Sequence, residues 1–160
     1  MRRFKYILYS LMAICLFSIT ACESEKDLII LSGELPSKVK ALYLVGNATP
    51  KNPTWDIDNL DLLEQSEEDK FLWVYHGELR TDSRFKLCMR TGTWAQPFIH
   101  PVANEEPIGK DAVTGKKMQA PRLGGDDELW AVLEGGIYTL TFNLRDFSWS
   151  SVYEGPVPQE

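Results

Sequence analysis

The sequence predicts an all-β protein, a β-sandwich of about seven short strands. Short apolar or alternating segments recur along the chain between turn residues, whereas the spacing typical of a helix is scarce. The composition of the 160 residues, 44% hydrophobic and 25% charged, is ordinary for one globular domain. It excludes a disordered chain, a collagen-like repeat and a coiled-coil rod.

The first expected strand is the apolar run at residues 41–45, which lies between Pro36 and Gly46. Its length and its flanking turn residues are typical of a buried strand. The leucines that follow within residues 56–69 would fit one short helical turn. That turn is the only helical structure the sequence suggests.

The next two strands differ in pattern. Residues 71–76 are mostly apolar or β-favouring and precede Gly77, so this strand is expected to be buried on both faces. Residues 85–90 alternate, which predicts two faces of different character. The apolar face carries Phe85, Leu87 and Met89, and the opposite face carries Arg84, Lys86, Cys88 and Arg90.

A long segment rich in proline and glycine follows, between Pro97 and Asp127. Loops of this length without elements of their own are uncommon in compact domains and often bind a ligand, so we expect a binding loop here. The apolar run at residues 129–133 then predicts another strand.

The strongest local prediction is a hairpin near the end of the chain. Residues 138–144 alternate between apolar and polar side chains, residues 145–146 make the turn, and residues 147–153 alternate again. Pro156 and Pro158 end the ladder because proline has no amide hydrogen to donate. We therefore predict one domain over residues 40–155, with a tail at 156–160.

The N-terminus has the pattern of a secretory signal. Residues 1–5 are basic, and the 16 residues from 6 to 21 carry no charge. That run is shorter than the ~20 residues that span a bilayer as a helix, so a retained anchor is disfavoured. We predict a signal peptide over residues 1–21.

The end of this signal, Ile19-Thr20-Ala21-Cys22, resembles the lipobox of bacterial lipoproteins. The resemblance implies that Cys22 is lipidated and becomes the mature N-terminus, with residues 22–39 forming a tether. Several acyl chains, at about 0.8 kcal/mol for each buried methylene, would make a durable membrane anchor. The alternative is a plain signal with a chance cysteine.

The charge of the chain limits its expected partners, and its cysteines limit its expected disulfides. Removal of residues 1–21 takes away three basic residues and no acid, which moves the formal charge from −6 to −9. A negative domain without a basic cluster repels phosphates, so no nucleic-acid partner is expected. Cys88 is the one cysteine left in the predicted domain, so no disulfide forms there. It is either a small strand residue or a reactive thiol.

No catalytic motif is present. His76 and His100 are the only histidines, and neither belongs to a metal-binding pair. The acidic runs, including Asp126-Asp127-Glu128, are expected to be solvated faces, with a loop calcium site at Asp126 and Asp127 as the alternative. We therefore expect no enzyme, no cofactor and no metal.

Tryptophan is the prominent residue, with five in the chain. Trp73, Trp130 and Trp149 lie in predicted strands and are expected in the core. Trp55 and Trp94 lie in polar, proline-containing loops, where a tryptophan need not be part of the core. They either stand open as binding groups or cap the end of the sandwich.

Two exposed indoles suit a sugar ligand. A flat aromatic ring accepts the apolar face of a sugar ring, while neighbouring polar side chains bond to its hydroxyls. The polar candidates beside Trp55 and Trp94 are Asn47, Arg84, Lys86 and Arg90. Stacking leaves most hydroxyls hydrated, so we expect weak binding at one site, about −4 to −6 kcal/mol.

Several motifs in order resemble the starch-binding domains of SusE/SusF-like outer-membrane lipoproteins, over about residues 40–153. They are Leu42-Tyr43-Leu44-Val45-Gly46-Asn47-Ala48-Thr49-Pro50, Trp55-Asp56, Phe71-Leu72-Trp73, Gly77-Glu78-Leu79, Phe85-Lys86-Leu87 and Gly136-Ile137-Tyr138-Thr139-Leu140-Thr141-Phe142-Asn143-Leu144. The resemblance implies an immunoglobulin-like, carbohydrate-binding-module sandwich that holds maltooligosaccharide on an aromatic platform. Trp55 matches the tryptophan after the family's Ala-Thr-Pro loop, and Trp94 matches an aromatic after the strand that contains Lys86.

The leading hypothesis is a non-catalytic glycan-binding lipoprotein anchored to the outer membrane through Cys22 and facing the cell exterior. Its expected partners are a starch-like glucan, an outer-membrane transporter complex and that complex's glycan-binding lipoprotein. The family commonly carries several such domains, whereas one is expected here, which forfeits the avidity of tandem sites. The alternative is a protein-interaction or structural lipoprotein of such a complex without a sugar site.

Overall fold

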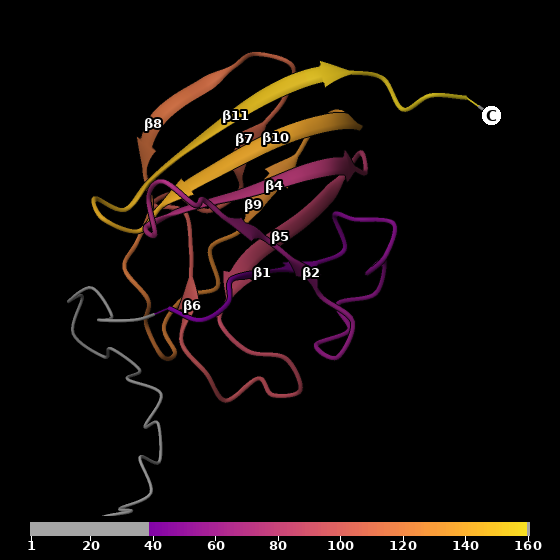
Figure 1. The fold of residues 1–160 in the computed structure, drawn as a ribbon. Coiled ribbons are helices and arrows are strands. Elements are labelled where there is room, and N and C mark those ends of the chain that lie inside the picture. Colours follow the sequence, from indigo (N-terminus) through magenta and orange to yellow (C-terminus); the bar gives the residue numbers. More distant parts are fainter. Residues whose placement is uncertain (1–38, 160) are drawn as a thin grey trace, which may run out of the picture.

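The protein is a two-sheet β-sandwich (Figure 1). The computed structural model describes residues 39–159, and every regular element among them is a strand. The predicted all-β sandwich is therefore confirmed. The predicted signal peptide, Cys22 and most of the tether lie outside the described residues. Among the described residues, no helix is long and apolar enough to cross a membrane.

Sheet 1 has six strands in the order β2-β1-β5-β9-β7, with β6 also pairing with β5. All its pairs are antiparallel except β7 with β9. The strands are β1 (Tyr43–Gly46), β2 (Asp61–Leu62), β5 (Ser83–Cys88), β6 (Phe98–Ile99), β7 (Glu106–Ile108) and β9 (Trp130–Val132). β5 lies at the centre and pairs with β1, β6 and β9.

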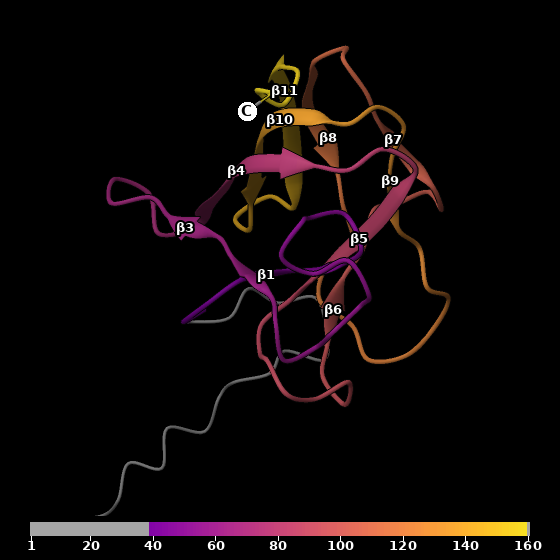
Figure 2. The same cartoon turned by 90° about the vertical axis from the view of Figure 1, so that its right-hand side faces the viewer.

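Sheet 2 has five antiparallel strands in the order β3-β4-β10-β11-β8. They are β3 (Glu64–Gln65), β4 (Leu72–Leu79), β8 (Val113–Lys117), β10 (Gly136–Asn143) and β11 (Ser148–Gly155). The predicted terminal hairpin is the pair β10–β11, and β10 shows the strict alternation between buried and half-buried residues that its sequence predicts. Figure 2, turned by 90°, shows the long strands of sheet 2 stacked above β5 and β9 of sheet 1.

The core between the sheets is built around Trp130, which is 0% exposed. Its ring stacks on Phe85 at 5.3 Å between centroids and meets Phe142 and Trp149 edge to face at 5.5 and 5.8 Å. Such edge-to-face pairs each add about 0.5–1.5 kcal/mol beyond area burial. Trp73 and Trp149 are also buried, so all three tryptophans predicted for the core lie in it.

The predicted helical turn within residues 56–69 is wrong. β2 and β3 occupy this segment, and the chain passes there from the edge of sheet 1 to the edge of sheet 2. Leu63 is buried and its N–H donates to the carbonyl of Leu42, whereas Leu62 is 59% exposed. Over a few residues, the alternating burial of a strand resembles part of a helical pattern. Only the pairing with neighbouring strands shows whether such a segment is a strand or a helix.

The expectation of one long loop between Pro97 and Asp127 is also corrected. This segment contains β6, β7 and β8, and with β2 and β3 they bring the strands of the described residues to eleven. β6 and β7 have two and three residues, less than two periods of an alternating pattern, so no periodicity marks them. β8 is longer, but it is an edge strand whose residues 114–117 are exposed, and its sequence lacks an apolar face.

Candidate functional site

The outer face of sheet 1, the face turned away from sheet 2, carries a second small hydrophobic cluster. Along β5, Phe85 and Leu87 point into the core while Cys88 points outward, as the alternation predicts. The loop at residues 47–60 contributes Ile57 and Leu60 to this cluster, and the N–H of Gly92 in the next loop donates to the carbonyl of Ile57. The cluster, here called the outer cluster, consists of Val45, Ile57, Leu60, Cys88 and Phe98, with Tyr43 and Trp55 packed against it.

Beside the outer cluster is a hollow of about 270 Å³, here called the Trp94 pocket. The Trp94 indole is 47% exposed, and its ring lies 5.8 Å from that of Phe98 at a 32° tilt. A large aromatic ring that is fixed on one side and open on the other is suited to stacking with a flat ligand. The pocket is lined by Lys86, Trp94, Gln96, Phe98, His100 and residues 123–127.

Lys86 lies at the floor of the pocket, with only 8% of its side chain exposed. Its ammonium donates to the Asp127 carboxylate at 2.5 Å, and it lies 4.3 Å from the Phe98 ring centre and 5.6 Å from that of Trp94. A charge this buried needs a counter-ion and polarisable neighbours, because dehydration costs several kcal/mol per ion. Asp127 and the two rings provide both.

His100 is buried beside this pair, with 4% of its side chain exposed. Its Nδ1 lies 2.8 Å from the Glu128 carbonyl oxygen and 3.9 Å from the Asp127 carboxylate. Burial lowers the pKa of His100, and the charges of Arg122 and Lys86 act in the same direction. The neutral ring at pH 7 donates its Nδ1–H to Glu128, which leaves Nε2 as an acceptor.

One wall of the pocket, residues 123–127, is organised by Arg122. Its guanidinium donates to the carbonyls of Gly124 and Asp126, to the Glu128 carboxylate and to Gln119 Oε1. Gly125 has a φ of 87°, and a Cβ there would collide with the same guanidinium. Glycine is therefore required for the chain to wrap round Arg122.

The opposite wall, which carries Trp94, is held by Gln96. This amide is 1% exposed; its oxygen accepts from the backbone N–H groups of Met89 and Arg90, and its NH₂ donates to the carbonyls of Arg90 and Thr93. All four hydrogen-bonding positions of the amide are used, so Gln96 positions the loop instead of offering groups to a ligand. The loop that presents Trp94 is thereby preorganised.

Trp55 has a different environment. It is half-buried against the outer cluster and has a φ of 61°. Its loop is pinned by Asn52, which is 1% exposed and exchanges hydrogen bonds of 2.7 and 2.8 Å with the backbone of Asp56. Trp55 does not line the Trp94 pocket. The two indoles are instead linked through the outer cluster, since Trp94 contacts its member Phe98.

Two of the predicted polar residues take part in the fold. Asn47 Oδ1 accepts from the N–H of Arg84 at 2.7 Å, and its own N–H donates to the carbonyl of Arg84 at 2.9 Å, which continues the pairing of β1 with β5. The Arg84 guanidinium donates to Glu105 at 2.7 Å. Neither side chain lines the Trp94 pocket. Of the six predicted ligand-binding residues, only Lys86 and Trp94 do so.

Cys88 behaves as a strand residue. It is 0% exposed, its Sγ lies 3.4 Å from the carbonyl of Arg90, and burial raises the pKa of the thiol to about 12. A thiol that stays protonated is a poor nucleophile. Among the residues that the structure describes, no group of three or more His, Cys, Asp or Glu side chains could hold a metal ion. The Asp127 carboxylate is engaged by Lys86 instead.

Sequence reasoning missed Phe98, His100, Asp127 and Arg122. Phe98 and His100 carried no periodic signal, because β6 has only two residues. The acidic run at residues 126–128 seemed a solvated face, and nothing local indicates that it meets Lys86, 41 positions away. That encounter depends on β5 and on the Arg122 loop together.

The pocket brings groups of different chemistry together. An exposed ring, an ammonium, a carboxylate and an imidazole acceptor converge on one small hollow. These groups suit a neutral ligand with both an apolar face and hydroxyl groups. Comparisons with protein-family models, curated proteins and solved structures found no match to this chain.

Proposed function

We propose that the protein is a non-catalytic glycan-binding lipoprotein and that the Trp94 pocket is its sugar site. The observation that supports this most is the half-exposed Trp94 indole beside the buried Lys86–Asp127 pair. An aromatic surface and a charged hydrogen-bonding pair in one hollow are the two groups that a sugar ring needs.

The geometry suggests how a sugar would lie. Its C–H face would cover the Trp94 ring, and its hydroxyls would reach the Asp127 carboxylate, which is 60% exposed, and the remaining protons of the Lys86 ammonium. The pocket, about 270 Å³, lies near the lower end of ligand sites of about 300–1,000 Å³. It would therefore hold a short part of a glycan, with the rest of the chain outside.

The class of glycan comes from the resemblance to SusE/SusF-like starch-binding domains. We propose a starch-like glucan as the ligand and an outer-membrane transporter complex with its glycan-binding lipoprotein as the partner. Lipidation of Cys22 would place the domain on the outer membrane, facing the cell exterior. One site without tandem copies supports only weak binding, in the millimolar to high-micromolar range.

The test is a titration with maltoheptaose followed by tryptophan fluorescence and calorimetry. Trp94→Ala is expected to weaken binding about tenfold or more, since stacking supplies much of the contact. Asp127→Asn should also weaken binding, because it removes the charged acceptor. Trp55→Ala is the matched control: it removes an equal ring that does not line the pocket, and a smaller loss is expected.

Circular dichroism of each variant shows whether the sandwich is retained. Wild-type affinity in the folded Trp94→Ala variant would remove the site assignment. Equal losses in Trp55→Ala and Trp94→Ala would instead support a platform shared by both rings. Binding of another glycan but not of maltoheptaose would preserve the site and change the ligand class.

A second candidate function is a protein-interaction or structural role in such a complex, without a sugar site. It is favoured by the structural engagement of Asn47 with β5, of Arg84 with Glu105 and of Trp55 with the outer cluster. Co-purification with membrane partners in the absence of glycan, together with no binding to a panel of glucans, would support it over glycan binding.

A further inference from the structure

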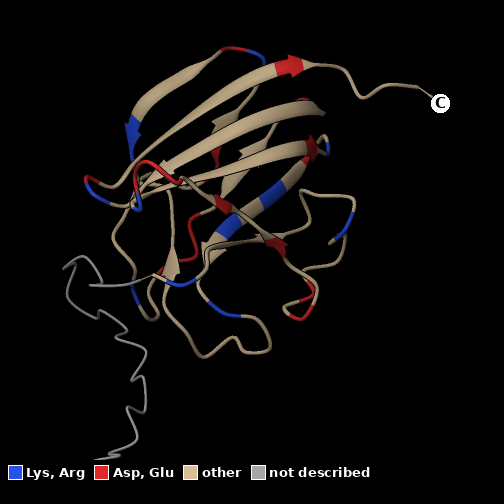
Figure 3. Ribbon diagram, viewed as in Figure 1, with Lys and Arg blue, Asp and Glu red and all other residues tan. Residues whose placement is uncertain are grey.

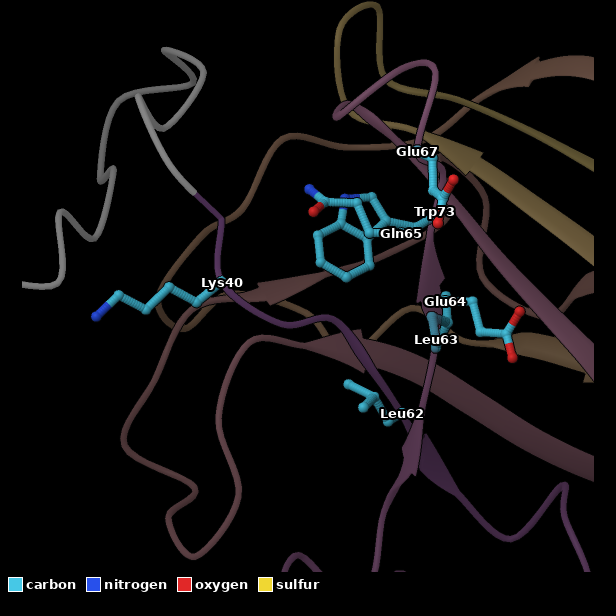
Figure 4. A pocket seen from close by; sticks show the side chains of 7 residues that line it. All are labelled: Lys40, Leu62, Leu63, Glu64, Gln65, Glu67 and Trp73. Carbon is cyan, nitrogen blue, oxygen red and sulfur yellow. The ribbon is translucent and has the colours of Figure 1, made fainter.

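Two hollows on the described part of the chain differ in the groups that they offer to a ligand. The larger, about 590 Å³ and here called the edge groove, lies where the chain passes from β2 to β3 (Figure 4). Its buried lining residues are Leu63 and Trp73, and the Nε1 of Trp73 has no accessible surface, so neither offers a polar atom. The Trp94 pocket, in contrast, is lined by buried polar side chains, among them Lys86 and His100.

His100 brings an unused acceptor to the Trp94 pocket. A carbonyl oxygen only accepts, so the 2.8 Å contact with Glu128 places a proton on Nδ1 and leaves the lone pair of Nε2 free. No hydrogen bond joins Nε2 to another described residue. The side chain keeps 4% of its surface, and Nε2 is not one of the fully buried polar atoms that lack a partner. Because His100 lines the pocket, a ligand there can reach this nitrogen.

Asp127 supplies a second acceptor close to the first. Its Oδ1 accepts from the Lys86 ammonium at 2.5 Å and lies 3.9 Å from Nδ1 of His100. Its Oδ2 has no hydrogen bond to another described residue, and the side chain is 60% exposed. Lys86 has three ammonium protons, of which Asp127 takes one. The pocket therefore presents two free acceptors beside one donor.

Two free acceptors call for two donated protons. One hydroxyl carries a single proton, so it satisfies either acceptor but not both. Two hydroxyls on adjacent carbons donate to both acceptors, and their oxygens still accept from an ammonium. A glucose residue linked through O1 and O4 has free hydroxyls at O2, O3 and O6, of which only O2 and O3 are adjacent. A residue linked through O1 and O3 has no adjacent pair.

We propose that His100 Nε2 and Asp127 Oδ2 accept from the O2 and O3 hydroxyls of one sugar ring, whose C–H face lies on Trp94. This inference rests on the proposed glycan-binding function and names the part of the glycan that the site reads. O1 and O4 stay outside these contacts, so the glycan chain continues in both directions out of the pocket. His100 is then a specificity-determining residue, and internal residues of a 1,4-linked glucan are selected over those of a 1,3-linked one.

Calorimetric titration of the full chain with three ligands tests the proposal. They are maltoheptaose, maltoheptaose methylated at O2 and O3, and maltoheptaose methylated at O6. Both derivatives add methyl groups, but only the first loses the protons that His100 and Asp127 would accept. Methylation at O2 and O3 should weaken binding about tenfold or more, and methylation at O6 should weaken it less than about threefold. Equal affinities of the two derivatives, or a larger loss at O6, would overturn the proposal.

The variant His100→Asn tests the residue itself. The amide of asparagine can still donate to the Glu128 carbonyl, but no atom replaces Nε2. Maltoheptaose should bind about five- to tenfold more weakly. Methylation at O2 and O3 should then cost less affinity than in the wild type, a coupling that a purely structural role of His100 would not produce. Wild-type affinity in the folded variant would overturn the proposal.

Gln65→Ala is the matched control in the edge groove, where Figure 4 shows the Gln65 side chain beside the Trp73 indole. It should bind maltoheptaose as the wild type does. Backbone amide exchange in β10 reports whether each variant keeps the sandwich, and the ligand series decides the question if His100→Asn does not fold.

The ligand series also separates this proposal from the proposed function. If maltoheptaose binds and tolerates methylation at O2 and O3, the glycan site stands and the reading of the hydroxyl pair is wrong. If no glucan binds to the wild type, both proposals fail. Loss of binding in Gln65→Ala, with unchanged binding in Trp94→Ala, would move the site to the edge groove and overturn both.

Discussion

The outer faces of the two sheets differ although one chain builds both. Sheet 2 presents a bare face, in which β10 alternates strictly between buried and half-buried residues and Val152 of β11 is 49% exposed. Sheet 1 is covered by loops, and β5 is buried at every position except Arg84. Figure 3 shows the contrast in charge, with basic residues on β5 and few charges along the middle of β4, β10 and β11.

The bare face has the simpler requirements. Thr139 and Thr141 of β10 lie opposite His76 and Val74 of β4, and Thr139 bonds to His76 and Glu154. β-branched and small polar side chains satisfy a solvated sheet without a cover. This face needs no covering loop.

The polar side chains of the covered face need partners within the protein. Loops over β5 exclude water, so Lys86 needs Asp127 and Phe98, and His100 needs the Glu128 carbonyl. Removal from water also strengthens every polar interaction there. The binding site that we propose therefore lies on the sheet whose outward residues are buried and not on the sheet whose outward residues are hydrated.

The largest expected difference between the faces is in packing. Phe98→Ala removes a ring that is 8% exposed and supports Trp94 and Lys86, so the free energy of unfolding should fall by about 3 kcal/mol. Val152→Ala on the bare face should change it by no more than about 0.5 kcal/mol. Urea denaturation of both variants measures the difference. Similar losses in the two would mean that the outer cluster is not a true second core.

A smaller difference in the free energy of unfolding is expected between the removal of an arginine on the covered face and the removal of an exposed one. Arg122→Ala removes the guanidinium that organises residues 123–127, and about 1.5–3 kcal/mol should be lost because the Glu128 carboxylate keeps only part of its bonding. Arg145→Ala breaks an exposed pair with Asp69 and should cost less than about 1 kcal/mol. Hydrogen exchange should accelerate in the loop at residues 123–127 only in Arg122→Ala. Unchanged exchange there would show that the glycines alone shape the loop.

The smallest expected effect concerns pH. Burial lowers the pKa of His100 below its ordinary 6.5, so the unfolded chain binds a proton at a higher pH than the folded protein does. As the pH falls below about 6.5, the free energy of unfolding should drop by up to about 1.4 kcal/mol per pH unit until the folded pKa is reached. Above that window the contribution is constant.

The groups that face His100 are Lys86, Arg122, Asp127 and the Glu128 carbonyl, and all belong to the covered face. His100→Gln should remove the dependence between pH 7 and the folded pKa, whereas the matched variant His76→Gln on the bare face should leave it. Stability curves of the three proteins, measured by denaturation from pH 5 to pH 8, give the comparison. A slope that persists in His100→Gln would assign the effect to other groups.

The sequence by itself determined the β-sandwich, the terminal hairpin and the inward positions of Trp73, Trp130 and Trp149. These follow from alternation with period two and from apolar runs bounded by turn residues, which are local patterns. The direction of Lys86, away from Phe85 and Leu87, followed from the same alternation. Its burial did not, because alternation reports which face a residue takes and not whether that face is covered.

Only the tertiary structure decided the site. Lys86 and Asp127 meet through the pairing of distant strands. Trp55 and Trp94 lie on different loops, and only Trp94 lines the pocket beside β5. Asn47 and Arg84, which the sequence suggested for a ligand, are used by the strand pairing and by Glu105. The physical reason is that hydrogen bonds and charges act over a few ångströms in space, while the pattern of the chain records only neighbours along it.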